Sequence, residues 1–370
     1  MRLRILVLPG DGIGPEVIAQ AVRVLKLVGR IFDHDIDCAD APIGGTAIHL
    51  TGSPLPDGTK RLALDADATL LGAVGRPEFD GFPPERRPER GLLELRELLG
   101  VYANLRPVRA LPCLLDASPL KPDIVSGTDL IVVRELTAGL YYGKPRGIYG
   151  EGPETRAVDT MTYTRAEIER VSRLAFDLAR TRRKHVTSVD KSNVLENSRL
   201  WRRVVIDVAK EYPDVTLAHL FVDNCAMQLI INPTRFDVLL TENVFGDILS
   251  DEAAVLAGSI GMLPSASLGD VRPSGFRGGL YEPIHGSAPD IAGRNIANPL
   301  GAIGSVAAMF DYGFNLKDEA KAIEDAIETV IAGGTVTADL ARDGQSAATT
   351  TEVGDAVCAA IEARHARAVA

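Results

Sequence analysis

The feature that most constrains this fold is an alternation of short aliphatic runs with stretches of helical periodicity. The first run, residues 3–8, is almost uninterrupted, which is typical of a strand buried on both faces of a parallel sheet. After a glycine-rich turn, Pro15 stands where a helix would start, and apolar residues then recur at helical spacing: Val17, Ile18, Ala21, Val22, Leu25 and Val28. We therefore expect an α/β protein with its site at the strand ends.

Later segments repeat this alternation along the chain. The patterns predict strands over residues 68–71, 129–133, 186–189 and 236–241. An amphipathic helix is predicted over residues 164–182, and it opens with a capping box made by Thr164 and Glu167. Strands that alternate with helices in this way favour a sheet of parallel or mixed direction.

Length and charge limit the classes of function. The chain has 370 residues, which suggests two domains or one large domain with an insertion, and its net charge of −10 argues against a nucleic-acid or anionic-lipid surface. The apolar run at the start is too short for a signal peptide, and no stretch has the roughly 18 apolar residues of a membrane helix. Its four cysteines are scattered, so we expect reduced thiols in a cytoplasmic protein.

The motif GDGIGPE, residues 10–16, follows the first expected strand and opens the first helix. This position invites comparison with the dinucleotide motif GxGxxG, but the third glycine of that motif would fall at position 15, which is proline. We therefore expect a tight turn beside a ligand cleft and not a conventional Rossmann site.

Three arginines near expected strand ends are candidates for anion binding: Arg96 in GLLELR, Arg106 in NLRP and Arg134 in VVREL. Guanidinium groups bind carboxylates through paired hydrogen bonds, so together they would suit a dicarboxylic acid. Taken alone, each arginine is more typical of a surface salt bridge. Arg134 differs because it directly follows a buried apolar strand, where a charge needs a partner.

Carboxylates and one lysine suggest a metal-assisted site. Asp247 and Asp251 are four residues apart, which on a helix places both on one face about 6 Å apart. Without another evident counter-charge, such a pair would suit Mg²⁺ or Mn²⁺, and Asp223 is a candidate third ligand. Solvated helix faces also carry such pairs. Lys191 follows an expected strand, and a nearby cation would favour its neutral, basic form; an exposed lysine is the alternative.

The segment 281–299, YEPIHGSAPDIAGRNIANP, has the composition of a ligand-binding loop. Gly286, Ala288 and Gly293 leave room for a ligand against the backbone, and Asp290 would accept hydrogen bonds from ribose hydroxyls. A purely structural loop is the alternative.

Taken in order, these segments resemble the β-decarboxylating isocitrate/isopropylmalate dehydrogenase family from about residue 3 to about residue 350. The resemblance rests on GDGIGPE, GLLELR, ANLRP, VRELTAGLYYG, SVDKSNVLE, FVDNCAMQL, FGDILSDEA, GSIGMLPSASLG and HGSAPDIAG. It implies an isopropylmalate dehydrogenase-like two-domain α/β fold with a parallel or mixed sheet, not a conventional Rossmann fold. The implied large cofactor domain spans residues 1–101 and 258–370, and the implied middle domain, with the dimer interface and the catalytic lysine, spans residues 102–257. Segments 270–279 and 301–310 depart from the family pattern.

The resemblance also implies site roles, matched residue by residue. It implies a homodimer in which Lys191 and Asp223 enter the partner's site. The implied acid–base pair is Lys191 and Tyr141. The implied substrate residues are Arg96, Arg106, Arg134, Leu92, Leu93, Val194 and Asp223. The implied Mg²⁺ or Mn²⁺ ligands are Asp223, Asp247 and Asp251. The implied NAD-binding residues are Glu89, His285, Gly286, Ser287, Ala288, Asp290, Ile291 and Asn298.

The implied reaction is NAD-dependent oxidative decarboxylation of a 3-substituted malate, with 3-isopropylmalate of leucine biosynthesis as the main expectation. Leu92 and Leu93 precede Arg96 by four and three residues on one expected helix, so they share its face. Two leucines suit an alkyl group and cannot pair a third carboxylate; the alternative is that both leucines simply pack the core. Tartrate, homoisocitrate or a bulkier alkylmalate remain alternative substrates, and a non-catalytic regulatory relative is the alternative from another class.

Overall fold

The computed structural model describes residues 1–272, 274–342 and 344–369, which form two compact units. Unit 1 comprises Met1–Val101, Leu111–Ser118 and Ala257–Ala370, and unit 2 comprises Tyr102–Ala110 and Pro119–Leu256. Unit 1 therefore includes the short segment Leu111–Ser118, which the expected boundaries had placed in the middle domain. The predicted division at residues 101 and 257 into a cofactor domain and a dimerisation domain remains a prediction.

The strands of unit 1 run in the order β2-β1-β3-β12-β11. Neighbours from β2 to β12 are parallel, and β11 is antiparallel to β12. The first strand is buried on both faces from Ile5 to Leu8, as its aliphatic pattern predicts. The bounds are β1 Arg2–Gly10, β2 Asp35–Asp40, β3 Ala68–Ala73, β11 Pro264–Val271 and β12 Arg277–Pro283.

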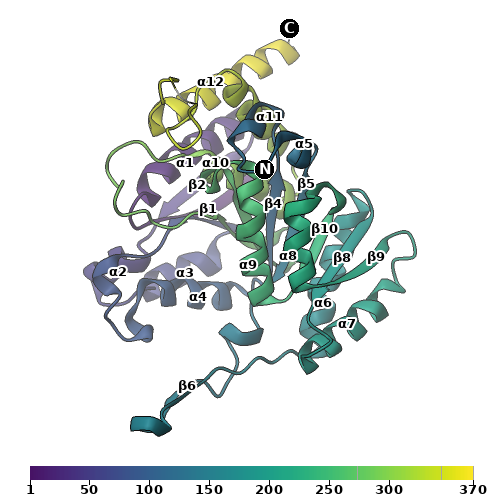
Figure 1. Cartoon of the computed structure of the whole chain (residues 1–370). Helices are drawn as coiled ribbons and strands as arrows, with labels where there is room; N and C mark the ends of the chain where they lie inside the picture. Colours follow the sequence, from purple (N-terminus) through teal and green to yellow (C-terminus); the bar gives the residue numbers. More distant parts are fainter. Residues whose placement is uncertain (273, 343, 370) are drawn as a thin grey trace. The chain divides into compact units, whose positions relative to one another are not determined.

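Helices cover both faces of this sheet (Figure 1). One face is packed by α1 Gly14–Ile31, α10 Leu300–Ala308, α11 Lys317–Ala332 and α12 Thr350–Val369. The other is packed by α2 Gly44–Thr51, α3 Asp57–Asp65 and α4 Pro88–Leu99. Pro15 lies in the first turn of α1, where a missing N–H costs nothing. The unusual segment 301–310 lies in the fully buried α10 and at the start of the π-helical turn Met309–Gly313, so its side chains are part of the core.

Unit 2 has the strand order β4-β5-β10-β8-β9, with β4 antiparallel to β5 and the remaining neighbours parallel. The α/β class with a mostly parallel sheet is thus confirmed. The bounds are β4 Ala103–Arg109, β5 Asp129–Glu135, β8 His185–Asp190, β9 Thr216–Phe221 and β10 Val238–Thr241. The predicted capping box of Thr164 and Glu167 is present at the start of helix α6, Arg165–Arg180.

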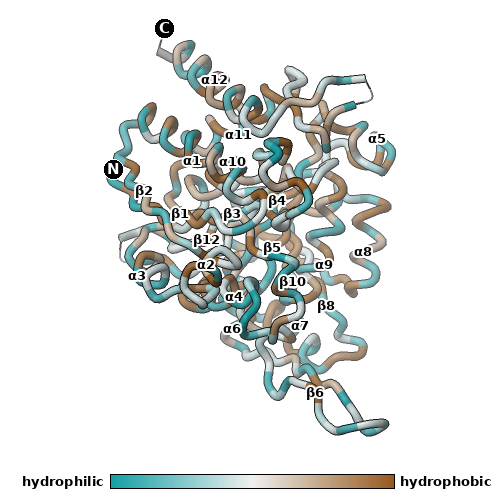
Figure 2. The backbone as a smooth tube through the Cα atoms, turned by 90° about the vertical axis from the view of Figure 1, so that its left-hand side faces the viewer, coloured by the Kyte–Doolittle hydropathy of each residue, from teal (hydrophilic) through white to brown (hydrophobic). Residues whose placement is uncertain are grey.

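The helices of unit 2 are α5 Pro122–Val125, α6 Arg165–Arg180, α7 Glu196–Ala209, α8 Val222–Ile231 and α9 Asn243–Ala254. In this unit, α6 packs against α7 and α8 packs against α9. A small hairpin of β6 Gly147–Tyr149 and β7 Arg156–Val158 projects from the unit in both views (Figures 1 and 2).

Three further expectations can be compared with the structure. Of the segment 270–279, residues 270–271 end β11 and residues 277–279 begin β12, while residue 273 lies outside the described residues. Across the described part of the chain, no helix is both long enough and apolar enough to cross a bilayer. All four cysteines are free thiols.

Candidate active site

Strand register in unit 2 brings the predicted polar residues to one edge. Arg134 at the end of β5 lies opposite Thr241 of β10, and Thr241 lies opposite Val189 of β8. The residues after these strands therefore emerge at the same edge, among them Asn243 at the start of α9 and Lys191 after β8. The carboxyl ends of parallel strands are the usual place for a ligand site.

Arg134 is buried and held by polar partners, as the position of a charge after an apolar strand predicts. Its Nε and Nη2 atoms donate to Asn243 Oδ1 at 3.0 and 2.7 Å, and Nη1 donates to Asp247 Oδ1 at 2.5 Å. Gly246, one turn into α9, makes room for this side chain, because a Cβ there would lie 2.6 Å from Arg134 Cγ. The glycine of the motif FGDILSD thus permits the close approach of the arginine.

Arg106 on β4 occupies the same site and binds the second carboxylate. Its Nη1 atom donates to Asp251 Oδ1 at 2.9 Å and to Ser250 Oγ at 2.6 Å, while Nε donates to Asn104 Oδ1. Its Nη2 atom lies 3.7 Å from Asp247 Oδ1.

These contacts correct one step of the sequence argument. Asp247 and Asp251 were expected to have no counter-charge other than a metal ion. In the structure, Arg134 pairs with Asp247 and Arg106 pairs with Asp251. The reason is that strand pairing brings both arginines against the first turns of α9, a contact between residues more than a hundred positions apart.

Tyr141 joins this cluster from a 3-10 turn, Gly139–Tyr141, that follows β5. Its hydroxyl donates to Asp247 Oδ2 at 2.9 Å, and the guanidinium of Arg134 lies over its ring at 5.8 Å from the centroid. Partial burial, together with the Asp247 carboxylate that accepts its hydrogen bond, raises the pKa of the Tyr141 hydroxyl. The phenol therefore keeps its proton near neutral pH, as a proton donor must.

Lys191 and Asp223 lie together at the edge of unit 2. Lys191 Nζ is 2.6 Å from Asp223 Oδ1, and this hydrogen bond is the main cause that lowers the pKa of Asp223. No group of three or more His, Cys, Asp or Glu residues that could hold a metal ion occurs among the residues described for this chain. Asp223 therefore does not complete a metal site with Asp247 and Asp251 within one chain. Val194, predicted to line the substrate pocket, is 63% exposed.

In unit 1, Arg96 lies on α4, and its Nη2 atom donates to Glu282 Oε1 at 2.8 Å. Its Nε atom is buried without a hydrogen-bond partner among the described residues. Leu92 and Leu93 precede it on the same helix, as expected. Both leucines are half-buried, and Leu92 packs against the core cluster of unit 1. Core packing thus accounts for part of the role assigned to Leu92.

The GDGIGPE motif of unit 1 forms a tight turn that holds the 285–293 loop. The backbone N–H of Ile13 donates to Ser287 O at 2.8 Å, and Gly12 lies so close that a Cβ would fall 1.9 Å from the same oxygen. The carboxylate of Glu16 accepts the backbone N–H groups of Gly293 and Asn295. The predicted tight turn is confirmed, and its hydrogen bonds hold this loop in place.

The loop itself exposes several predicted cofactor residues. A Cβ at Gly286 would meet nothing within 4 Å, and Asp290 is exposed. The Nε2 atom of His285 is buried without a hydrogen-bond partner among the described residues, and burial lowers the pKa of its imidazole. Ala288 has a positive φ of 37°, and Ile291 donates its N–H to the Ala288 carbonyl, which closes the turn.

Glu89 and Ser287 meet beside Gly75, because a Cβ there would lie 3.2 Å from Glu89 Oε1 and 3.4 Å from Ser287 Oγ. Asn298 is buried, and its amide is already engaged: Nδ2 donates to Asp339 Oδ2 and Oδ1 accepts the N–H of Leu300. Its cofactor contact remains a prediction.

Sequence reasoning did not identify two residues of the cluster, Asn243 and Ser250. Both lie within the motif TENVFGDILSDEA, on the buried face of α9. A polar residue on the buried face of a helix needs a hydrogen-bond partner, and this pattern is the signal by which the sequence could have indicated them. Sequence reasoning also did not identify Tyr163 and Glu242, which contact the backbone of Asn243 and of the first turn of α9.

Comparison with known proteins identifies the family of this chain. Residues 4–357 match the isocitrate/isopropylmalate dehydrogenase family model. A 3-isopropylmalate dehydrogenase from Shouchella clausii (strain KSM-K16) is 56% identical over 361 residues, covering 98% of each chain. A 3-isopropylmalate dehydrogenase from Aquifex aeolicus (strain VF5) is 52% identical, again covering 98% of each chain.

Solved structures give the same result for the fold. The isocitrate dehydrogenase from Methylococcus capsulatus superposes with a TM-score of 0.85 at 36% identity, covering 97% of this chain and 99% of the other. The apo β-decarboxylating dehydrogenase from Thermococcus kodakarensis gives a TM-score of 0.78 at 38% identity, covering 98% and 96%. The chain therefore belongs to the isocitrate/isopropylmalate dehydrogenase family.

Proposed function

We propose that this protein catalyses the NAD⁺-dependent oxidative decarboxylation of (2R,3S)-3-isopropylmalate to 4-methyl-2-oxopentanoate and CO₂, a step of leucine biosynthesis. The observation that carries the proposal is the cluster in unit 2, where Arg106, Arg134 and Tyr141 gather around Asp247 and Asp251. Relatives that cover nearly the whole chain at more than half identity carry the name 3-isopropylmalate dehydrogenase.

The side chains of this cluster have the chemistry that the reaction requires. Arg106 and Arg134 offer guanidinium groups for the carboxylates of a malate, and the paired geometry of these groups suits that ligand. Lys191 of a second chain would accept the proton of the C2 hydroxyl as C2 loses its hydride. Tyr141, which holds its proton, donates it to C3 after the C3 carboxylate has left as CO₂. Arg96 in unit 1 is assigned to the same carboxylates by its sequence motif.

The residues present fit a divalent cation and NAD⁺. Asp247 and Asp251 present hard oxygen donors one turn apart on α9, and Asp223 of a second chain is the proposed third ligand. The orphaned Nε2 of His285, the open Gly286 and the exposed Asp290 fit a nucleotide on the 285–293 loop. When bound, NAD⁺ accepts the hydride, and the cation stabilises negative charge on the C2 oxygen.

An alkyl group on C3 suits the apolar side chains beside Arg96. Leu92 and Leu93 are both half-buried on α4, and Leu92 also packs against the core cluster of unit 1. Burying the three carbons of an isopropyl group would contribute roughly 2 kcal/mol, at about 0.8 kcal/mol per carbon. A third carboxylate against the same leucines would cost several kcal/mol.

A homodimer is part of the proposal. Apolar side chains on α8 and at α9, two helices that pack side by side in unit 2, are between 40% and 64% exposed: Met227, Ile230, Ile231, Ile248 and Val255. Ile148 on the projecting β6–β7 hairpin is 77% exposed. Apolar patches of this kind mark protein interfaces, and a second copy of the chain would cover them while supplying its Lys191 and Asp223. A cytoplasmic location remains part of the same proposal.

The test is NADH formation with 3-isopropylmalate, isocitrate, tartrate and homoisocitrate, with and without Mn²⁺. We expect kcat/KM for 3-isopropylmalate to exceed that for isocitrate and tartrate at least about a hundredfold, since a few kcal/mol separate an alkyl from a carboxylate in this pocket. A faster rate with isocitrate or tartrate would overturn the substrate assignment.

A further inference from the structure

We propose that the hydroxyl of Tyr163, together with the carboxylate of Glu242, positions Asn243 and through it the Arg134 guanidinium, and so sets the affinity for the malate substrate. This inference rests on the proposed function, because it takes Arg134 as a ligand of a substrate carboxylate. Tyr163 and Glu242 are positioning residues and do not touch the substrate.

Asn243 fixes the plane of the Arg134 guanidinium. One oxygen, Asn243 Oδ1, accepts from both Nε and Nη2 of Arg134 at 3.0 and 2.7 Å. The amide nitrogen of Asn243 donates in turn to Leu136 O at 3.2 Å and Ala138 O at 3.0 Å. The side chain is therefore locked on both sides, and any shift of its backbone moves the arginine.

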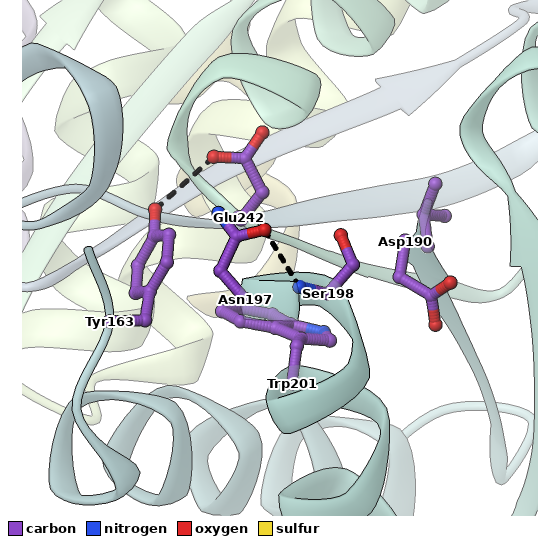
Figure 3. Close-up of a pocket in the computed structure, with 7 residues that line it drawn as sticks. Tyr163, Asp190, Asn197, Ser198, Trp201 and Glu242 are labelled. Carbon is purple, nitrogen blue, oxygen red and sulfur yellow. Dashed lines mark hydrogen bonds between the residues drawn. The ribbon is translucent and has the colours of Figure 1, made fainter. Parts of the chain in front are cut away.

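The backbone of Asn243 is held by the phenol of Tyr163. The N–H of Asn243 donates to Tyr163 Oη at 2.9 Å, and that hydroxyl donates to Glu242 Oε2 at 3.2 Å. Burial raises the pKa of Tyr163, so its hydroxyl keeps the proton that it donates. Figure 3 shows the phenol and the Glu242 carboxylate directed toward each other.

Glu242 links Tyr163 to α9, the helix that carries the proposed metal ligands. Its carboxylate accepts the N–H groups of Val244 at 3.0 Å and Phe245 at 2.6 Å, which caps the first turn of α9. Both side chains, Tyr163 and Glu242, are less than 10% exposed. The ring of Trp201 meets that of Tyr163 edge-on at 5.6 Å, so the phenol has little freedom to move.

Tyr163 also reaches the turn that carries Tyr141. A Cβ at Gly139 would lie 2.3 Å from Tyr163 Oη, and Gly139 has a φ of +77°, so only glycine suits this position. The N–H of Gly139 donates to Thr162 O at 3.1 Å. One hydroxyl thus lies at the junction of the Tyr141 turn, the start of α9 and the Arg134 clamp.

The test is Tyr163→Phe, which removes the hydroxyl and keeps the ring. We expect KM for 3-isopropylmalate to rise at least about tenfold while KM for NAD⁺ stays within about twofold, because Tyr163 supports the Arg134 clamp and the Tyr141 turn, whereas most of the proposed NAD-binding residues lie on the 285–293 loop. Calorimetric binding of 3-isopropylmalate with Mn²⁺ should weaken by a similar factor. Tyr212→Phe is the matched control: its ring is also buried and stacked on Phe176, and its hydroxyl contacts Arg173 O at 3.5 Å and the Asp177 side chain, both on α6. Both KM values should stay at the wild-type level in the control.

Glu242→Gln provides a second variant, which keeps the size of the side chain and an acceptor oxygen. It should raise KM for 3-isopropylmalate in the same selective way, and it decides the question if Tyr163→Phe does not fold. A lower melting temperature with both KM values unchanged, or an equal rise in both, would overturn the inference and leave Tyr163 a structural role. If the wild type itself fails to oxidise 3-isopropylmalate, the proposed function is refuted and this inference with it.

Discussion

Replacing Asp11 with asparagine should destabilise unit 1 although the two side chains have the same shape. Asp11 is fully buried in the GDGIGPE motif. Its Oδ2 accepts the backbone N–H groups of Gly45 and Gly75 at 2.7 and 3.0 Å. Its Oδ1 accepts from the N–H and hydroxyl of Thr46 and from Nε of Arg76. Both oxygens are thus surrounded by donors.

An asparagine must turn its NH₂ group toward one of these two sets. In either orientation, at least two buried donors then face another donor, and each unpaired group costs about 1–3 kcal/mol, or about 2–6 kcal/mol for the pair. The wild-type carboxylate carries a desolvation cost that asparagine avoids, so we expect a loss of about 2–3 kcal/mol.

Urea unfolding followed by far-ultraviolet circular dichroism measures this loss. Asp65→Asn, an exposed position on α3 of the same unit, is the control and should change the free energy of unfolding by less than about 0.5 kcal/mol. KM for NAD⁺ should also rise in Asp11→Asn, since this turn holds the 285–293 loop through Ile13 and Ser287. An Asp11→Asn protein as stable as the control would refute the assignment of these hydrogen bonds to the carboxylate.

Three other predictions follow from the site. The kcat/KM for NAD⁺ should exceed that for NADP⁺ at least about tenfold, because the exposed Asp290 repels a 2′-phosphate and Ile291 offers it no cation; comparable values would contradict this role. Activity should vanish in EDTA and return with Mn²⁺ or Mg²⁺, while the melting temperature changes little, because Arg106 and Arg134 already balance Asp251 and Asp247; full turnover in EDTA would exclude the metal assignment. Mixing Lys191→Ala with Asp251→Ala should restore about a quarter of the wild-type activity, since half of the dimers are hybrids with one intact site. No recovery after verified subunit exchange would mean that each chain builds its own site.

Local patterns determined much of the fold from the sequence alone. Three predicted features depend only on residues close together in the sequence: strand β1, the start of α1 at a proline and the capping box of α6. The structure confirms all three. The proline at position 15 was sufficient to argue against a conventional Rossmann turn. Motif order was sufficient to identify the family, which the comparisons confirm.

Tertiary structure alone decided which charges meet. Arg134 and Asp247 are 113 residues apart, and Arg106 and Asp251 are 145 apart, so their pairing depends on the register of β4, β5 and β10. The sequence therefore indicated residues that the structure brings together, Arg106, Arg134, Tyr141, Asp247 and Asp251, but assigned the counter-charge of the aspartates to a metal alone. The sequence did not indicate Asn243 or Tyr163, because both contact residues that are distant in the sequence. A hydrogen bond between distant residues leaves no periodic pattern, whereas a helix or strand is encoded by the spacing of its own side chains.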